Sequence, residues 1–109
     1  MISVIIPTLW KSEGFLDRLL QISNNELVGE IILIDNAPQD TDISHISKLN
    51  HIKEPENIFV TPAWNKGVSL AKYDKLLIVN DDVETDWSVI NLAYPYITED
   101  RGIIGAVNK

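Results

Sequence analysis

The sequence predicts a three-layer α/β domain built on a mostly parallel sheet. Three segments, at residues 2–6, 30–34 and 75–79, are apolar at nearly every position. Because their apolar residues do not alternate with polar ones, they are typical of strands covered on both faces, as parallel strands usually are. Two weaker apolar runs, at residues 58–60 and 103–107, are expected to add strands. Amphipathic segments lie between the runs, and this alternation favours an α/β fold with helices on both faces.

The helices are predicted from caps and from the spacing of apolar residues. Ser12 is expected to cap a first helix. Its buried face would comprise Phe15, Leu16, Leu19 and Leu20. Thr61 and Pro62 fit a cap followed by proline at the first helical position. A further helix would be capped within residues 85–86 and ended by Pro95. A short helix is predicted over residues 41–49, with Ile43, Ile46 and Leu49 facing inward.

Size and composition exclude several classes of protein. A chain of 109 residues has room for one domain. The absence of cysteine excludes disulfide scaffolds, thiol catalysis and cysteine-based zinc sites. A net charge of −7 would repel phosphate backbones and anionic membranes, so nucleic acid is not an expected partner. No apolar run approaches the length of about 18 residues that a transmembrane segment needs, and no signal peptide is indicated. A cytoplasmic location is therefore expected.

Candidate site residues gather where the predicted strands end. In an open parallel sheet, ligands bind at the carboxyl ends of the strands. Pro7 and Thr8 follow the first strand, Asp35 and Asn36 follow the second, and an Asn-Asp-Asp sequence at residues 80–82 follows the Leu76–Val79 run. The sequence therefore places polar and acidic groups where a ligand would lie.

Asp81 and Asp82 are the sharpest of these features. Adjacent carboxylates repel one another unless a cation or hydrogen-bond donors compensate them. With oxygen ligands and no cysteine, such a pair suits Mg²⁺ or Mn²⁺ shared with phosphate oxygens. A solvated acidic turn before the next helix explains the pair equally well. Asp35 and Asn36 are similarly ambiguous, because they fit either an Asx turn or recognition of a ribose hydroxyl or a base edge.

Two residues inside the helix predicted after Thr61 are also candidates. Glycine costs about 1 kcal/mol relative to alanine in a helix interior, so Gly67 indicates close packing or the approach of a ligand. Asn65 lies on the same helix. His45 and His51 are six residues apart, which fits no shared helix face, and they are predicted to be ordinary surface or rim histidines.

Four segments, taken in order, resemble the N-terminal half of family-2 glycosyltransferases with the GT-A fold. They are residues 2–8 (ISVIIPT), 31–36 (IILIDN), 63–67 (AWNKG) and 76–83 (LLIVNDDV). Residues 102–107 resemble the strand that follows in those enzymes. The resemblance covers nearly the whole chain and implies a Rossmann-like sheet of the GT-A type with a nucleotide-sugar site.

The resemblance also implies roles for the residues at the first two strand ends. Pro7 and Thr8 would lie beside the nucleoside. Asp35 and Asn36 match the paired acidic position that reads the base and ribose, with Asn36 in place of the more frequent second aspartate.

Further roles are implied for residues later in the chain. Asn65 and Gly67 match the helix beneath the diphosphate and the sugar. Residues 80–82 match the Asp-x-Asp motif, with asparagine in its first place. Asp82 would hold the divalent ion, Mn²⁺ or Mg²⁺, that bridges the diphosphate, and Asp81 would face the ribose or the sugar.

The activity that the resemblance implies is inverting transfer of a sugar from a nucleoside-diphosphate donor. In the family, the base that deprotonates the acceptor comes from a later, acceptor-binding half. Residues 1–109 are expected to form a single donor-binding domain without that half, and no catalytic base is identified among the later acids Glu84, Asp86, Glu99 and Asp100. The alternative is a non-catalytic binding or assembly module, which would self-associate or pair with a partner chain that replaces the missing half.

Overall fold

The protein folds around one parallel sheet in the part that the structure describes, residues 1–83 and 85–97 of the computed structural model. The strands are β1 (Ile2–Thr8), β2 (Val28–Asp35), β3 (Leu49–Lys53) and β4 (Lys75–Ile78). Their spatial order is β3-β2-β1-β4, and all neighbouring pairs are parallel. The predicted parallel sheet and the three strongest strands of the sequence are therefore confirmed.

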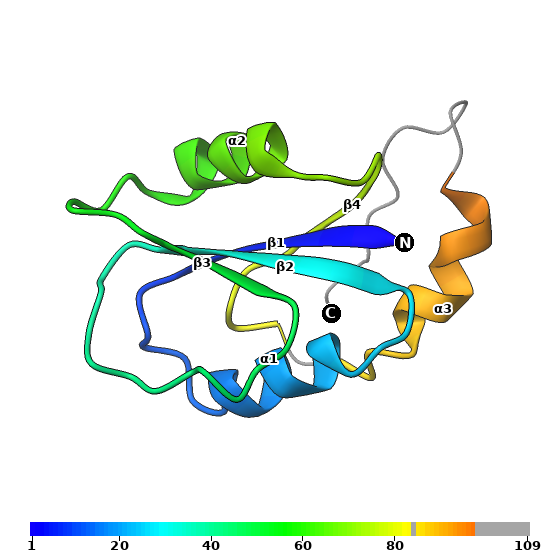
Figure 1. Ribbon diagram of the computed structural model, residues 1–109, viewed down its shortest axis with the longest axis horizontal. Helices are drawn as coiled ribbons and strands as arrows, with labels where there is room; N and C mark the ends of the chain where they lie inside the picture. Colours follow the sequence, from blue (N-terminus) through cyan, green and yellow to red (C-terminus); the bar gives the residue numbers. More distant parts are fainter. Residues whose placement is uncertain (84, 98–109) are drawn as a thin grey trace.

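Helices cover the two faces of the sheet. Helix α1 (Phe15–Ser23) lies on one face and α2 (Val60–Leu70) on the other (Figure 1). Helix α3 (Val89–Ala93) follows Trp87, and its Ile90 packs in the same core cluster as α1. This arrangement confirms the three layers. None of the helices in the described ranges is long and apolar enough to cross a membrane.

The side chains of β1 alternate between two cores. Val4 and Ile6 pack beneath α1, whereas Ile5 packs against α2 and contributes to a cluster that contains Ala63. All three β1 side chains are at most 1% exposed. Because successive residues of a strand point to opposite faces, a strand between two helical layers must be apolar at consecutive positions, as this sequence is.

Two predicted elements are wrong. No helix forms at residues 41–49: residues 41–48 are irregular backbone and turns, and Leu49 begins β3. Ile43 and Ile46 are buried as expected. The run at residues 58–60 is not a strand, because Val60 already begins α2. The strand that the sequence does not indicate is β3, with the sequence LNHIK. It lies at the edge of the sheet, and its residues are half-buried to exposed. An edge strand of this kind lacks the apolar run that marks a central one.

The start of α1 also differs from the prediction. Gly14 precedes the helix in the left-handed region, with φ of 76°. Ser12 is not its cap, and the Oγ of Ser12 instead accepts a hydrogen bond from Arg18 at 2.5 Å. The expected apolar face is shifted, since Leu16 and Leu20 are each 37% exposed. The buried face carries Phe15, Arg18, Leu19, Ile22 and Ser23.

The last helix is shorter than predicted but ends where expected. A 3₁₀ turn (Tyr94–Tyr96) that contains Pro95 follows α3 directly. Before the helix, the amide of Ser88 donates to Asp86 Oδ1 at 3.0 Å. Hydrogen bonds from the amide and hydroxyl of Ser88 hold the pKa of Asp86 below its usual value. The strand predicted at residues 103–107 lies outside the described residues.

A buried carboxylate fixes the turn that leads into β4. Glu30 is 5% exposed, and its Oε2 accepts hydrogen bonds from the Ser3 hydroxyl and the Lys72 amide, both at 2.6 Å. Tyr73 donates its amide to the same serine hydroxyl at 3.2 Å. The connection between α2 and β4 is thereby anchored to the two central strands, which sets where β4 begins.

Candidate functional site

A cavity of about 580 Å³ opens at the carboxyl end of the sheet. Pro7 and Thr8 line it from the end of β1, and Asn36 lines it from the loop after β2. The start of α2 contributes residues 59–62, and the loop after β4 contributes residues 80–82. Most of the site residues predicted from the sequence thus meet in one cavity, although they come from separate segments of the chain.

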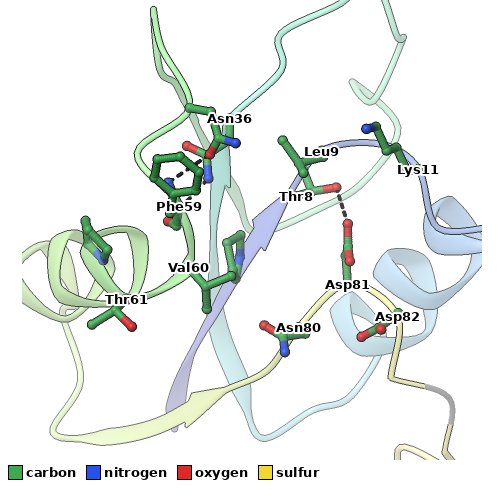
Figure 2. A pocket seen from close by; sticks show the side chains of 13 residues that line it. Thr8, Leu9, Lys11, Asn36, Phe59, Val60, Thr61, Asn80, Asp81 and Asp82 are labelled. Atoms are coloured by element: carbon green, nitrogen blue, oxygen red, sulfur yellow. Dashed lines mark hydrogen bonds between the residues drawn. The ribbon is translucent and has the colours of Figure 1, made fainter.

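Asp81 is held at both its side chain and its backbone. The Thr8 hydroxyl donates to Asp81 Oδ2 at 2.8 Å, as Figure 2 shows. The same Thr8 oxygen accepts a hydrogen bond from the Trp10 amide at 3.0 Å. Buried Arg18, on α1, donates to the Asp81 carbonyl oxygen at 2.6 Å. Hydrogen bonds to Asp81 therefore connect the loop after β4 to the end of β1 and to α1.

Asp82 differs from its neighbour because its carboxylate is exposed. Within residues 1–83 and 85–97, it has no hydrogen-bond or ion-pair partner. Among the lining residues that the structure describes, Lys11 is the only one with a cationic side chain. No group of three or more His, Asp or Glu side chains in the described ranges is placed to hold a metal ion by itself. In the described part of its lining, the cavity therefore offers the free carboxylate of Asp82 beside that of Asp81, which is already hydrogen-bonded.

Asp35 is fully buried and does not line the cavity. Its Oδ1 accepts a hydrogen bond from the Trp10 indole Nε1 at 2.8 Å and from the Ala37 amide at 3.0 Å. Its Oδ2 lies 2.7 Å from Nε2 of His51, on β3. Both oxygens of Asp35 are thus used within the protein, where they hold the loop after β1 and the edge strand in place.

Asn36 does line the cavity, and its amide group connects two segments. The side-chain Oδ1 accepts a hydrogen bond from the Ile58 amide at 3.2 Å. The side-chain Nδ2 donates to the Phe59 carbonyl oxygen at 3.5 Å. Asn36 is 7% exposed. Its side chain therefore joins the end of β2 to the segment that begins α2.

Asn65 and Gly67 lie on α2 but outside the cavity lining. Asn65 is exposed. A Cβ atom added to Gly67 would overlap Cγ2 of Ile5 on the central strand. The close packing that this glycine indicates is therefore observed, and it brings α2 against β1.

Several residues at the site are not indicated by the sequence. Phe59 lines the cavity and has φ of 66° and ψ of −176°. Its neighbours Ile58 and Val60 are apolar and β-branched, so the local pattern favours a strand and gives no sign of this backbone. The sequence also gives no sign that Arg18 is buried at the site, because a charged residue in an amphipathic helix is normally expected on the solvated face.

The architecture is that of an α/β domain whose cavity lies at the carboxyl ends of parallel strands, the place where open sheets of this kind bind ligands. The sequence model of the family described as "Glycosyl transferase family 2" matches residues 3–109. This chain therefore belongs to glycosyltransferase family 2, as the resemblance of its four segments implied.

A solved structure supports the fold assignment. The chain is similar to S. aureus TarS 1–349, with a TM-score of 0.64 and 17% sequence identity. The likeness covers 88% of this chain and 32% of the TarS chain. At this identity it shows the fold, which agrees with the expected GT-A type. No curated protein gives a significant sequence match.

Proposed function

We propose that the cavity binds the nucleoside-diphosphate part of a sugar donor, and that the chain contributes this donor site to inverting glycosyl transfer. The observation that carries the proposal is that Pro7, Thr8, Asn36 and the Asp81-Asp82 pair line one cavity. Its volume of about 580 Å³ lies within the range of about 300–1,000 Å³ typical of small-molecule sites. Family membership supports a nucleotide-sugar donor.

The acidic end of the cavity fits a divalent ion of the Mg²⁺ or Mn²⁺ type. Mg²⁺ is commonly held by one or two carboxylates, with phosphate oxygens of the substrate and water completing its coordination. Asp82 supplies an exposed carboxylate without a partner among the described residues, and Asp81 lies beside it. When bound, the ion would stabilise the charge of the departing nucleoside diphosphate as a Lewis acid.

The chain's own residues would orient the donor around that end. Thr8 and Arg18 fix Asp81, so the loop that carries Asp82 has a defined position before the donor binds. Lys11 would supply a positive charge toward the phosphate oxygens, a role that lysine often has in phosphate sites. Asp35 would act indirectly, by holding Trp10 and the loop between Thr8 and Lys11.

The transfer step needs more than these residues. In an inverting displacement, the acceptor hydroxyl oxygen bonds to the anomeric carbon while the bond from that carbon to the diphosphate breaks. The hydroxyl proton must pass to a base, and such a base contributes typically about 10²–10⁴-fold to the rate. None of the described residues is assigned to that role. Because the chain spans 32% of the TarS chain, transfer itself is proposed for a protein in which other residues supply the base.

The donor site can be tested by calorimetry of the chain with UDP, GDP and dTDP, each with Mn²⁺. We expect at least one of them to bind, and we expect Asp82→Asn to weaken that binding by about tenfold or more, as loss of an interaction that supports a metal commonly does. Asp74→Asn is the matched control. Asp74 is exposed and directly precedes β4, so it lies at the amino ends of the strands, whereas the cavity lies at their carboxyl ends. Equal binding by the wild type and Asp82→Asn would contradict the metal site.

A further inference from the structure

Phe59 combines two properties that core packing does not explain. Its side chain is 70% exposed, although it is a large aromatic group at the cavity. Its backbone, with φ of 66° and ψ of −176°, occupies a region that is essentially restricted to glycine. Strain of this kind persists only where the surrounding structure enforces it, and it clusters at functional sites. The ring is therefore held toward solvent against its own backbone preference.

The hydrogen bonds around Phe59 show how this conformation is enforced. The Phe59 amide donates to Asn57 Oδ1 at 2.8 Å. Its carbonyl oxygen accepts from the Ala63 amide at 3.3 Å and from Asn36 Nδ2 at 3.5 Å. Because Asn36 also holds the Ile58 amide, the backbone on both sides of the ring is anchored to the end of β2.

The cavity has two chemically different ends. Phe59 and Val60 lie on one side, whereas Asp81 and Asp82 lie on the opposite side, as Figure 2 shows. Leu9 adds a further partly exposed apolar side chain to the lining. A ligand that matches both ends has a planar apolar group at one end and phosphate groups, compensated by a cation, at the other.

We propose that Phe59 is the platform on which the base of the donor nucleotide stacks, and that Asn36 acts as a positioning residue that holds this platform. This inference rests on the proposed function, because it takes the nucleoside diphosphate to be bound beside Asp82. An aromatic face accepts any nucleobase. Phe59 therefore distinguishes a nucleotide from a phosphate ligand that has no base, while other groups select among the bases.

Three substitutions at Phe59 distinguish the effect of losing the aromatic ring from the effect of relieving the backbone strain. Phe59→Ala removes the ring and keeps a Cβ atom in the strained backbone, Phe59→Gly removes both, and Phe59→Trp keeps an aromatic face. With Mn²⁺ present, we expect the Ala and Gly variants to bind UDP or GDP about tenfold more weakly, and the Trp variant to bind normally. Affinity for inorganic pyrophosphate with Mn²⁺, which has no base, should be the same in all four proteins.

Thermal unfolding provides the second measurement. Alanine normally gives a more stable protein than glycine, but the order reverses where φ is positive. We therefore expect Phe59→Gly to unfold at a temperature about 4 °C or more above that of Phe59→Ala. The same melts verify that the variants are folded.

The possible failures are distinguishable. If the wild type binds a nucleoside diphosphate and the Ala and Gly variants bind it equally well, the stacking role is overturned while the proposed function stands. If the wild type binds no nucleoside diphosphate with Mn²⁺, both are overturned. If Phe59→Gly unfolds at or below the temperature of Phe59→Ala, the ring is not held against backbone strain and the argument for a dedicated platform is overturned.

Discussion

Asp35 and Asn36 are neighbours in the sequence but act on different parts of the molecule. Asp35 turns toward Trp10 and His51, whereas Asn36 turns toward the segment before α2. Successive side chains at a strand end point to opposite faces of the sheet, so an adjacent pair of polar residues does not have to form a single binding feature. The buried aspartate organises the loop after β1, and the asparagine organises the rim of the cavity.

The bond between Trp10 and Asp35 gives a prediction at the scale of one hydrogen bond. Trp10→Phe removes one of the two donors to Oδ1 of a fully buried carboxylate and leaves the Ala37 amide as the other. A hydrogen bond to a charged group contributes about 1.5–3 kcal/mol. Trp87→Phe is the control, because the Trp87 indole nitrogen is buried without a hydrogen-bond partner in the described ranges. In urea denaturation, we expect Trp10→Phe to lower the free energy of unfolding by about 1.5–3 kcal/mol more than Trp87→Phe does. A larger loss for Trp87→Phe would contradict this account of Asp35.

The sequence indicates which residues reach the cavity better than it indicates their partners. Apolar strands that end at Thr8 and just before residues 80–82 predict that Thr8 and Asp82 lie there, because the carboxyl ends of parallel strands share one end of the sheet. The partners of Asp35 depend on a left-handed Trp10, with φ of 62°, and on β3 as the neighbour of β2. Both are consequences of tertiary structure, so no local pattern marks them.

At the scale of elements, α2 forms one side of the cavity. Its Gly67 packs directly on Ile5 of the central strand, and its first residues form the apolar side of the lining. The helix predicted after Thr61 is present, but Thr61 is not its cap, because Phe59 precedes the helix and Val60 begins it. The sequence does not indicate that the chain before α2 is a loop, because Ile58, Phe59 and Val60 have high β-propensity. In the structure, Asn36 accepts a hydrogen bond from the Ile58 amide and donates one to the Phe59 carbonyl oxygen.

A substitution at Gly67 tests this packing. Alanine in a helix interior is ordinarily about 1 kcal/mol better than glycine, but here its Cβ would overlap Cγ2 of Ile5. We expect Gly67→Ala to lower the free energy of unfolding by about 1–3 kcal/mol, as overpacking usually does. Its effect should shrink in an Ile5→Ala background, where the overlap is relieved. Val68→Ala, on an exposed position of the same helix, is the control, and a stabilising Gly67→Ala would contradict the close approach.

At the scale of the whole molecule, the net negative charge bears on how the cavity could hold an anionic ligand. A chain with a net charge of −7 repels an anionic diphosphate unless a cation intervenes. The cavity combines an exposed Asp82 with Lys11, the only cationic residue in the described part of its lining. A divalent ion would therefore supply most of the compensating charge. The family match over residues 3–109 supports the donor site that we propose for this part of the chain.

The most direct measurement of this claim is an NMR titration of the chain with Mn²⁺ in the presence and absence of the nucleoside diphosphate that binds. Because Mn²⁺ is paramagnetic, it broadens the signals of nearby nuclei. We predict that the amide signals of Asp81 and Asp82 broaden first when the nucleotide is present, that those of Asp74 at the amino ends of the strands do not, and that Asp82→Asn removes the effect. Broadening centred away from residues 80–82, or unchanged in Asp82→Asn, would contradict a metal-assisted donor site in this cavity.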